Sequence, residues 1–239
     1  MRDLNYIKKT GTALFAILIA TLSWQTAKAQ FTSYTNMLNT TVVASQSLFT
    51  AQTAVNKQRE SMRVAAGETP YASAASAIQP PSRQYAITAT DFRPLSPPIM
   101  PDQFANSATG VTPQTREEMR KLFVQTLAAF ESKARKNNLA NAFAFITAVA
   151  LQTKSGKQPA TSEINNLIAY FNNTLAANPT YYAIDPRQQQ MLYESLIING
   201  GIIAFLDAKG KESNNQQMRT QAEQLSSAIL KQFLGIDAR

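Results

Sequence analysis

The chain of 239 residues contains no cysteine and no histidine. Without cysteine it has no disulfide, no thiolate nucleophile, no cysteine-ligated metal and no iron–sulfur cluster. Without histidine it lacks the commonest general base and metal ligand, and every Ser-His-Asp or Cys-His site is excluded. The sequence therefore excludes most familiar hydrolase chemistry, and it predicts no cofactor and no metal site.

Charged side chains are also scarce, at 16% of the residues. The acidic ones are scattered, and they form no calcium loop; a nucleophile elbow and a glycine-rich phosphate cradle are missing as well. An enzyme here would need a carboxylate pair, a Ser-Lys dyad or an all-oxygen metal site, and none has a recognisable spacing. We therefore expect a protein that is not an enzyme, with a carboxylate-based hydrolase as the more distant alternative.

The first 29 residues have the features of a signal peptide. Arg2, Lys8 and Lys9 precede an uncharged apolar run over residues 10–22, which is too short to cross a bilayer comfortably. The run Ala27-Lys28-Ala29 then places small residues at the two positions that a signal peptidase reads, which predicts cleavage before Gln30. The alternative interpretation is an uncleaved anchor helix.

Removal of this leader takes away four basic residues and one acidic residue, so the mature chain keeps 19 basic against 14 acidic side chains, a net charge of +5. We expect no transmembrane segment after cleavage and a periplasmic or secreted location. Export and a dispersed charge also argue against nucleic-acid binding.

The mature chain divides into three parts. Residues 30–66 lack proline and place apolar side chains at helical spacing, which predicts an amino-terminal amphipathic helix that packs on its own domain or docks on another protein. Residues 67–111 form a proline-rich arm, since eight of the eleven prolines lie between residues 67 and 113. Within it, residues 85–104 should cross a helical surface in extended form, with their large apolar side chains as anchors. These are Tyr85, Ile87, Phe92, Leu95, Ile99, Met100 and Phe104. Residues 112–239 form a helical domain.

Five helices are predicted in that domain, which makes the fold class all-α: a five-helix bundle preceded by the amino-terminal helix and the arm. Their expected ranges are 112–136, 138–153, 161–178, 185–209 and 214–234. The second and fourth are the most apolar and should lie innermost. Gly200 and Gly201 inside the fourth helix indicate a close helix crossing, because each glycine in a helix costs roughly 1 kcal/mol relative to alanine.

Three polar residues are candidates for binding. Glu194 shares a helical face with apolar residues, where burial would raise the pKa of its carboxyl group. We expect it to bond Arg93, Asn141 or another polar group in the bundle, with catalysis or ligand binding as the alternative. Arg93, between Phe92 and Pro94, could hold the arm to Glu194 or to the carbonyl end of a helix.

Three stretches, residues 90–94 (TDFRP), 135–145 (RKNNLANAFAF) and 192–201 (LYESLIINGG), resemble a family of exported bacterial proteins of uncharacterised function. The resemblance covers about 60% of the chain, from Thr90 to Gly235. It implies an envelope or secreted protein and transfers no catalytic residue. It also implies that the sequons at Asn39 and Asn172 are not glycosylated.

The leading functional hypothesis is therefore an interaction module of the bacterial envelope or secreted fraction, whose partner is another envelope or secreted protein. The alternative is a small-molecule or lipid binder with a pocket between the inner helices, near Gly200, Gly201 and a group of aromatic residues. That group consists of Tyr170, Phe171, Tyr181, Tyr182 and Tyr193.

Overall fold

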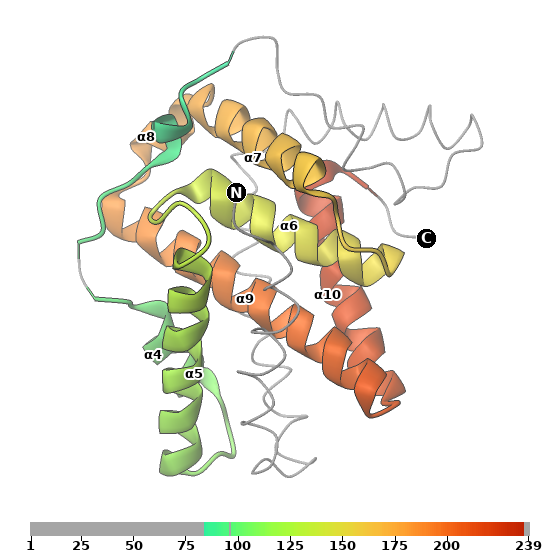
Figure 1. Cartoon of the computed structure of the whole chain (residues 1–239). Coiled ribbons are helices and arrows are strands. Elements are labelled where there is room, and N and C mark those ends of the chain that lie inside the picture. The colour runs from blue at the N-terminus through green and yellow to red at the C-terminus, as the bar shows by residue number, and fades with distance from the viewer. Residues whose placement is uncertain (1–83, 96, 237–239) are drawn as a thin grey trace.

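The structure is a computed structural model that describes residues 84–95 and 97–236 (Figure 1). The predicted leader, the predicted helix over residues 30–66 and the first half of the arm lie outside this range. The described residues form only helices and connections, apart from one isolated bridge between Asp91 and Asn138. The predicted all-α class is confirmed.

One short 3-10 helix and seven α-helices make up the described part of the chain. In order they are η1 (Ile87–Thr90), α4 (Met100–Ser107), α5 (Pro113–Glu131), α6 (Leu139–Ser155), α7 (Thr161–Ala176), α8 (Pro179–Ala183), α9 (Pro186–Glu212) and α10 (Gln216–Leu234). The five predicted helices correspond to α5, α6, α7, α9 and α10.

Helices α6 and α9 are central, as their apolar composition predicts. Helix α6 packs against α7, α9 and α10, and α9 packs against α4, α5, α6 and α10. Figure 1 shows α6 between α7 and α9, with α4 and α5 beside one end of α9. At the crossing of α6 and α9, a Cβ atom on Gly200 would stand 2.6 Å from the Phe145 ring. The glycine therefore serves the predicted close crossing.

Helix α9 is also the one described helix with the length and hydropathy of a membrane span. No membrane-spanning segment was expected after the leader. Of its most apolar window, 72% is buried inside the protein, against its neighbours in the bundle. This burial is typical of the core helix of a globular domain.

Helix starts follow the predicted chemistry more closely than helix ends do. The side chains of Thr112, Asn138 and Asp185 accept hydrogen bonds from backbone amides in the first turns of α5, α6 and α9. Pro113 and Pro186 occupy the first helical position, where a missing N–H costs nothing.

Two predicted helix ends are wrong. Helix α5 ends at Glu131 rather than Lys136, and Asn137 adopts a left-handed conformation (φ 52°) that turns the chain toward α6. Lys133, Arg135 and Lys136 therefore lie in the connection. Helix α9 continues through Gly210 to Glu212. A Cβ atom on Gly210 would approach the backbone nitrogen of Arg219 to 3.0 Å, so this glycine permits close packing of α9 and α10 and does not end the helix.

The predicted arm is extended only in part. Residues 100–107 form α4, a helix that tolerates Pro101 because proline fits the first turn. Helix α8 is also absent from the prediction, which ended the third helix at Pro179 without starting another. Ile87 and Leu95, expected as apolar anchors, are exposed, with exposed fractions of 40% and 62%.

Candidate functional site

The most elaborate polar arrangement in the described residues lies where the arm crosses the helical domain. From here on, the arm denotes only the described part of the predicted proline-rich arm that precedes α4, residues 85–95 and 97–99. Figure 1 shows it running along one edge of the molecule, past α7 and α8 and down to α4. Five side chains of the helical domain bind its backbone, and we call them the polar clamp. They are Asn138, Asn172, Asn173, Gln190 and Glu194.

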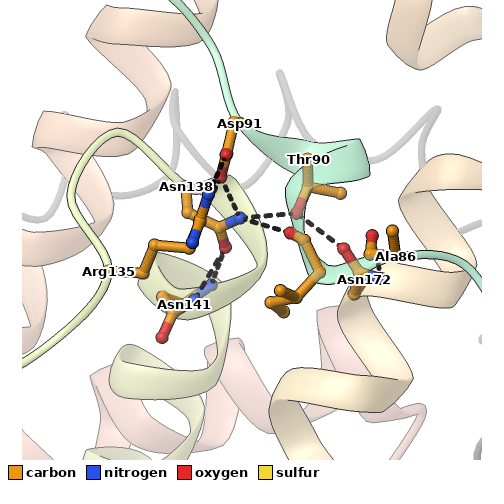
Figure 2. Close-up of polar contacts among 8 residues, drawn as sticks. Ala86, Thr90, Asp91, Arg135, Asn138, Asn141 and Asn172 are labelled. Atoms are coloured by element: carbon orange, nitrogen blue, oxygen red, sulfur yellow. Dashed lines mark hydrogen bonds and ion pairs between the residues drawn. The ribbon is translucent and has the colours of Figure 1, made fainter.

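Asn138, the residue that caps α6, is fully buried and joins the cap to the arm (Figure 2). Its Oδ1 accepts from the backbone nitrogen of Asn141 at 2.9 Å and from Asn141 Nδ2 at 2.8 Å. Its Nδ2 donates to the Ile87 carbonyl at 2.9 Å, to Thr90 Oγ1 at 3.0 Å and to Asp91 Oδ1 at 2.8 Å. One side chain therefore fixes both the start of a helix and the η1 turn of the arm.

Two adjacent asparagines of α7 hold the beginning of the arm. Asn173 Oδ1 accepts from the Tyr85 amide at 2.7 Å. Asn172 Nδ2 donates to the carbonyls of Tyr85 and Ala86, both at 3.1 Å, and its Oδ1 accepts from Thr90 Oγ1 at 2.9 Å. Both asparagines are buried, so these bonds satisfy amide groups that would otherwise be costly to place in a protein interior.

Gln190 and Glu194, one turn apart on α9, hold the end of the arm. Gln190 accepts from the Leu95 amide at 3.1 Å and donates to the Pro97 carbonyl at 3.2 Å and to Glu194 Oε1 at 2.8 Å. Glu194 Oε2 accepts from the amides of Ile99 and Met100, both at 2.8 Å. Ile99 offers α4 no capping side chain, so a carboxylate from another helix caps α4 in its place.

Apolar side chains fill the space beneath these bonds. Phe92, Met100 and Phe104 are buried in the core. The Phe92 ring meets Tyr193 edge-on at 5.2 Å between centroids, and Phe104 meets Phe123 of α5 at 5.6 Å. Such ring pairs add to the stabilisation that burial provides. The arm and α4 are thus part of the core of the domain.

An ion pair closes the outer side of the arm. Arg135 Nε donates to Asp91 Oδ1 at 2.7 Å, and a second guanidinium nitrogen reaches the other carboxylate oxygen. The hydrogen bond from Arg135 is the main cause that holds the pKa of the Asp91 carboxyl below its usual value, although partial burial opposes it. Asp91 therefore stays ionised beside Asn138 across the ordinary pH range.

Glu194 shows the opposite shift. Burial raises the pKa of its carboxyl group, and the hydrogen bonds from Met100, Gln190 and Ile99 only partly offset that effect. The nearby Glu131 carboxylate raises the pKa further. All three donors point at the carboxylate, so its oxygens are occupied by the protein itself. This geometry suits a structural acceptor better than a general acid or base, which must reach a substrate.

The three predicted candidates do not form one site. Glu194 is buried as predicted, and its partners are backbone amides and Gln190. Asn141 is buried one turn into α6 and bonds Asn138, away from Glu194. The predicted role of Arg93 is wrong: its side chain is exposed, and Arg135 makes the ion pair with the arm. Arg93 is thus exposed, whereas its neighbour Phe92 is buried in the core.

Sequence reasoning missed most of the polar clamp. Asn138 was recognisable as a helix cap, since it precedes a run of apolar residues at helical spacing. Asn172, Asn173 and Gln190 carry no such signal, because an amide in a helix is usually a solvated residue. The structure buries all three, and the path of the arm across α7 and α9 explains why.

The expected aromatic pocket is not supported by the placement of its residues. Tyr170, Phe171, Tyr181 and Tyr193 are buried in the core, whereas Tyr182 is 61% exposed. Burial raises the pKa of the Tyr181 hydroxyl to about 12, and it raises that of Tyr193 as well. At Gly200 the Phe145 ring fills the space beside the helix. Within residues 84–95 and 97–236, no group of three acidic side chains lies close enough to hold a metal ion.

These observations define the class: an all-α protein in which an arm of the same chain is bound, through its backbone, by buried amide and carboxylate side chains. Residues 8–239 match the Family of unknown function (DUF6683), and the chain belongs to that family. The match extends over nearly the whole chain, so arm and bundle belong to one family unit. No curated protein and no solved structure gave a significant match.

Proposed function

We propose that this protein is exported across the cytoplasmic membrane and acts outside the cytoplasm as a non-enzymatic interaction module. Its contact surface is the outer side of the arm, the side on which Ile87, Arg93 and Leu95 are exposed. The observation that carries the proposal is that one part of the arm binds the domain while another part is exposed to solvent. Its backbone and the buried side chains of Thr90 and Phe92 contact the domain, while Ile87, Arg93 and Leu95 are exposed.

The exposed fraction of Leu95 is the highest among the large apolar residues of the described chain, at 62%. Its own amide is held by Gln190 at 3.1 Å, so the backbone is fixed while the side chain remains outside. Tyr182, on α8, is similarly exposed. A large apolar side chain on a fixed backbone is a favourable anchor for a partner, because little conformational entropy is lost on binding.

The chemistry of the buried polar groups supports a binding role over an enzymatic one. Glu194 and Asp91 are the carboxyl groups in this region whose pKa values depart from the usual ones, and each is held by donors of the protein itself. A perturbed pKa is expected in a structural ion pair or helix cap as well as in an active site.

Export rests on the leader: a basic start, a short apolar run and the Ala27-Lys28-Ala29 site. Expression of the full chain in a bacterium, followed by fractionation and mass determination of the amino terminus, tests it. We expect a mature chain that starts at Gln30 and is found outside the cytoplasm. A chain that keeps Met1 and stays in the cytoplasm would contradict the proposal.

The contact surface is tested by capture from envelope and secreted fractions with the mature chain and the variant Leu95→Asp. The matched control is Val124→Asp, since Val124 is also an exposed apolar residue (43%) but lies on α5. We expect partners that the wild type and Val124→Asp retain and that Leu95→Asp loses at least tenfold. Equal recovery with all three proteins would contradict a role for the arm.

A further inference from the structure

Exposed apolar side chains gather around the outer side of the arm. Ile87 and Leu95 belong to the arm, and Tyr182 lies on α8, which the arm passes in Figure 1. Their exposed fractions are 40%, 62% and 61%. Among the large apolar residues of the described chain, only Val124 on α5 is comparably exposed. The grouping of three such side chains around one segment indicates a contact surface.

Two other parts of the helical domain border this part of the arm. Residues 132–138, between α5 and α6, meet it at the bridge between Asp91 and Asn138. Burial raises the pKa of the Tyr181 hydroxyl in α8, and the Asp91 carboxylate raises it further, so α8 stands close to the same point. Helix α9 begins at Pro186, directly after α8. The arm, the connection between α5 and α6, α8 and the start of α9 therefore border one another.

Cations predominate where these elements meet, with five basic side chains against three acidic ones. The basic ones, all exposed, are Arg93, Lys133, Arg135, Lys136 and Arg187. The acidic ones are Asp91, Glu131 and Asp185. Each acid is already bound, in turn by Arg135, by the Tyr193 hydroxyl at 3.2 Å and by backbone amides of α9. Arg93 and Arg187 have no acidic partner within the described residues. The rest of the described chain is nearly neutral, with nine basic and eight acidic side chains.

This mixture of single apolar side chains and cations favours a lipid surface over a protein as the partner. The centre of a protein–protein interface is depleted in charged residues, whereas here Arg93 lies between Ile87 and Leu95 along the arm. At a membrane surface the two kinds of side chain have separate partners. Apolar and tyrosine side chains enter the boundary below the headgroups, while lysine and arginine stay with the anionic headgroups.

We propose that this surface binds the headgroups of an anionic phospholipid membrane. The inference rests on the proposed function, because it names the partner of the same contact surface. The polar clamp holds the arm on the domain, and the Leu95 amide is bound by Gln190, so the apolar anchors stand on a fixed backbone. The surface consists of Ile87, Arg93, Leu95, Lys133, Lys136, Tyr182 and Arg187.

Sedimentation of the mature chain with vesicles tests the proposal. One set of vesicles contains phosphatidylcholine alone, and the other contains equal parts of phosphatidylcholine and phosphatidylglycerol. The variant Arg93→Gln with Arg187→Gln removes two cations of the surface. The matched control, Lys157→Gln with Lys211→Gln, removes two exposed cations beyond the end of α6 and in the last turn of α9, across the molecule from the arm in Figure 1. None of the four residues belongs to the polar clamp, so all three proteins should share one circular dichroism spectrum.

We expect the wild type to bind the anionic vesicles and to leave the neutral ones unbound. A lysine or arginine near an anionic surface strengthens binding about fivefold, so loss of Arg93 and Arg187 should weaken it about 25-fold, whereas the control should stay within about twofold of the wild type. Leu95→Asp should also weaken vesicle binding, because it replaces an apolar anchor with an anion.

Equal binding to both kinds of vesicle, or an equal loss in the two glutamine variants, would overturn the inference. Captured proteins that Leu95→Asp loses, found together with no preference for anionic vesicles, would show that the surface binds proteins. The inference would then fail while the proposed function stands. If the capture experiment also recovers the same proteins with the wild type, Leu95→Asp and Val124→Asp, both fail.

Discussion

Asn138 offers the sharpest test of how the arm is held, because its two functions are separable. Its Oδ1 caps α6, and its Nδ2 binds Ile87, Thr90 and Asp91 in the arm. Asn215 caps α10 in the same way, with its Oδ1 accepting from the Met218 amide at 3.1 Å, and it makes no contact with the arm in the described structure. The pair Asn138→Ala and Asn215→Ala therefore separates the cap from the clamp.

The expected magnitudes follow from the bonds lost. Loss of an asparagine cap costs about 1 kcal/mol, within a range of about 0.5–2, and applies to both variants. Asn138→Ala also removes three donor contacts to the arm. Thr90 keeps its bond to Asn172 and Asp91 keeps Arg135, so only the Ile87 carbonyl loses its donor among these contacts. At about 1 kcal/mol per net hydrogen bond, the additional loss is about 1–3 kcal/mol.

Urea unfolding of the mature chain, followed by circular dichroism, provides the assay. We expect a loss of about 1 kcal/mol in unfolding free energy for Asn215→Ala and about 2–4 kcal/mol for Asn138→Ala. Thermal midpoints should fall in proportion, by roughly 2–4 °C per kcal/mol for a chain of this size. Limited proteolysis should cut within residues 85–99 faster in Asn138→Ala only. Equal destabilisation and equal cleavage of the two variants would refute the reasoning, since Asn138 would then act as a cap alone.

Three further predictions concern other parts of the same structure. Gly200→Ala should lower the unfolding free energy by about 1–3 kcal/mol in denaturant melts, because its Cβ would meet the Phe145 ring at 2.6 Å; a neutral result would show that the crossing of α6 and α9 can relax. Burial raises the pKa of Glu194 in the native state above 4.5, so the native state binds this proton more tightly than the unfolded state does. The unfolding free energy of the wild type relative to Glu194→Gln should therefore fall as pH rises from 4.5 through the native pKa. A constant difference between the two proteins across that window would contradict the burial of the carboxylate. The pKa of Asp91 is lowered below 3.8, so its contribution is complete above that value and is lost as pH falls through the native pKa, and Asp91→Asn should remove this acid-dependent loss in melts below pH 4.

The sequence predicted the helices of the bundle because their signals are local. Asp185 and Pro186 open α9, and the apolar residues that follow repeat at helical spacing, so neither start nor face needed tertiary information. Helix ends were less predictable. Glycine is a common residue just after a helix end, so Gly210 looked like a stop signal. In the structure the helix continues through Gly210, which lies against Arg219 and Asn215 where α10 packs on α9.

The polar clamp was not predictable for a related reason: it binds the backbone of the arm through contacts that join residues 51 to 95 positions apart. Arg93 looked like the natural partner of Glu194 because opposite charges suggest pairing. The structure instead satisfies Glu194 with the amides of Ile99 and Met100, groups that every residue carries and that a sequence therefore does not distinguish. Asn172 and Asn173 likewise bind backbone groups, those of Tyr85 and Ala86, which no sequence pattern marks.

The use of amides in the clamp follows from the composition of the arm. An arm that is rich in proline offers few N–H donors and cannot extend a sheet, so a strand of the usual kind could not hold it. Amide side chains both donate and accept, which lets Asn172 bind two carbonyls while Asn173 accepts the single amide of Tyr85. Replacing either asparagine with aspartate would keep an acceptor and lose the donor, so Asn172→Asp should loosen the arm more than Asn173→Asp. Protease sensitivity of residues 85–99 would measure that difference, and the reverse order would mean that the Tyr85 amide, rather than the two carbonyls, secures the start of the arm.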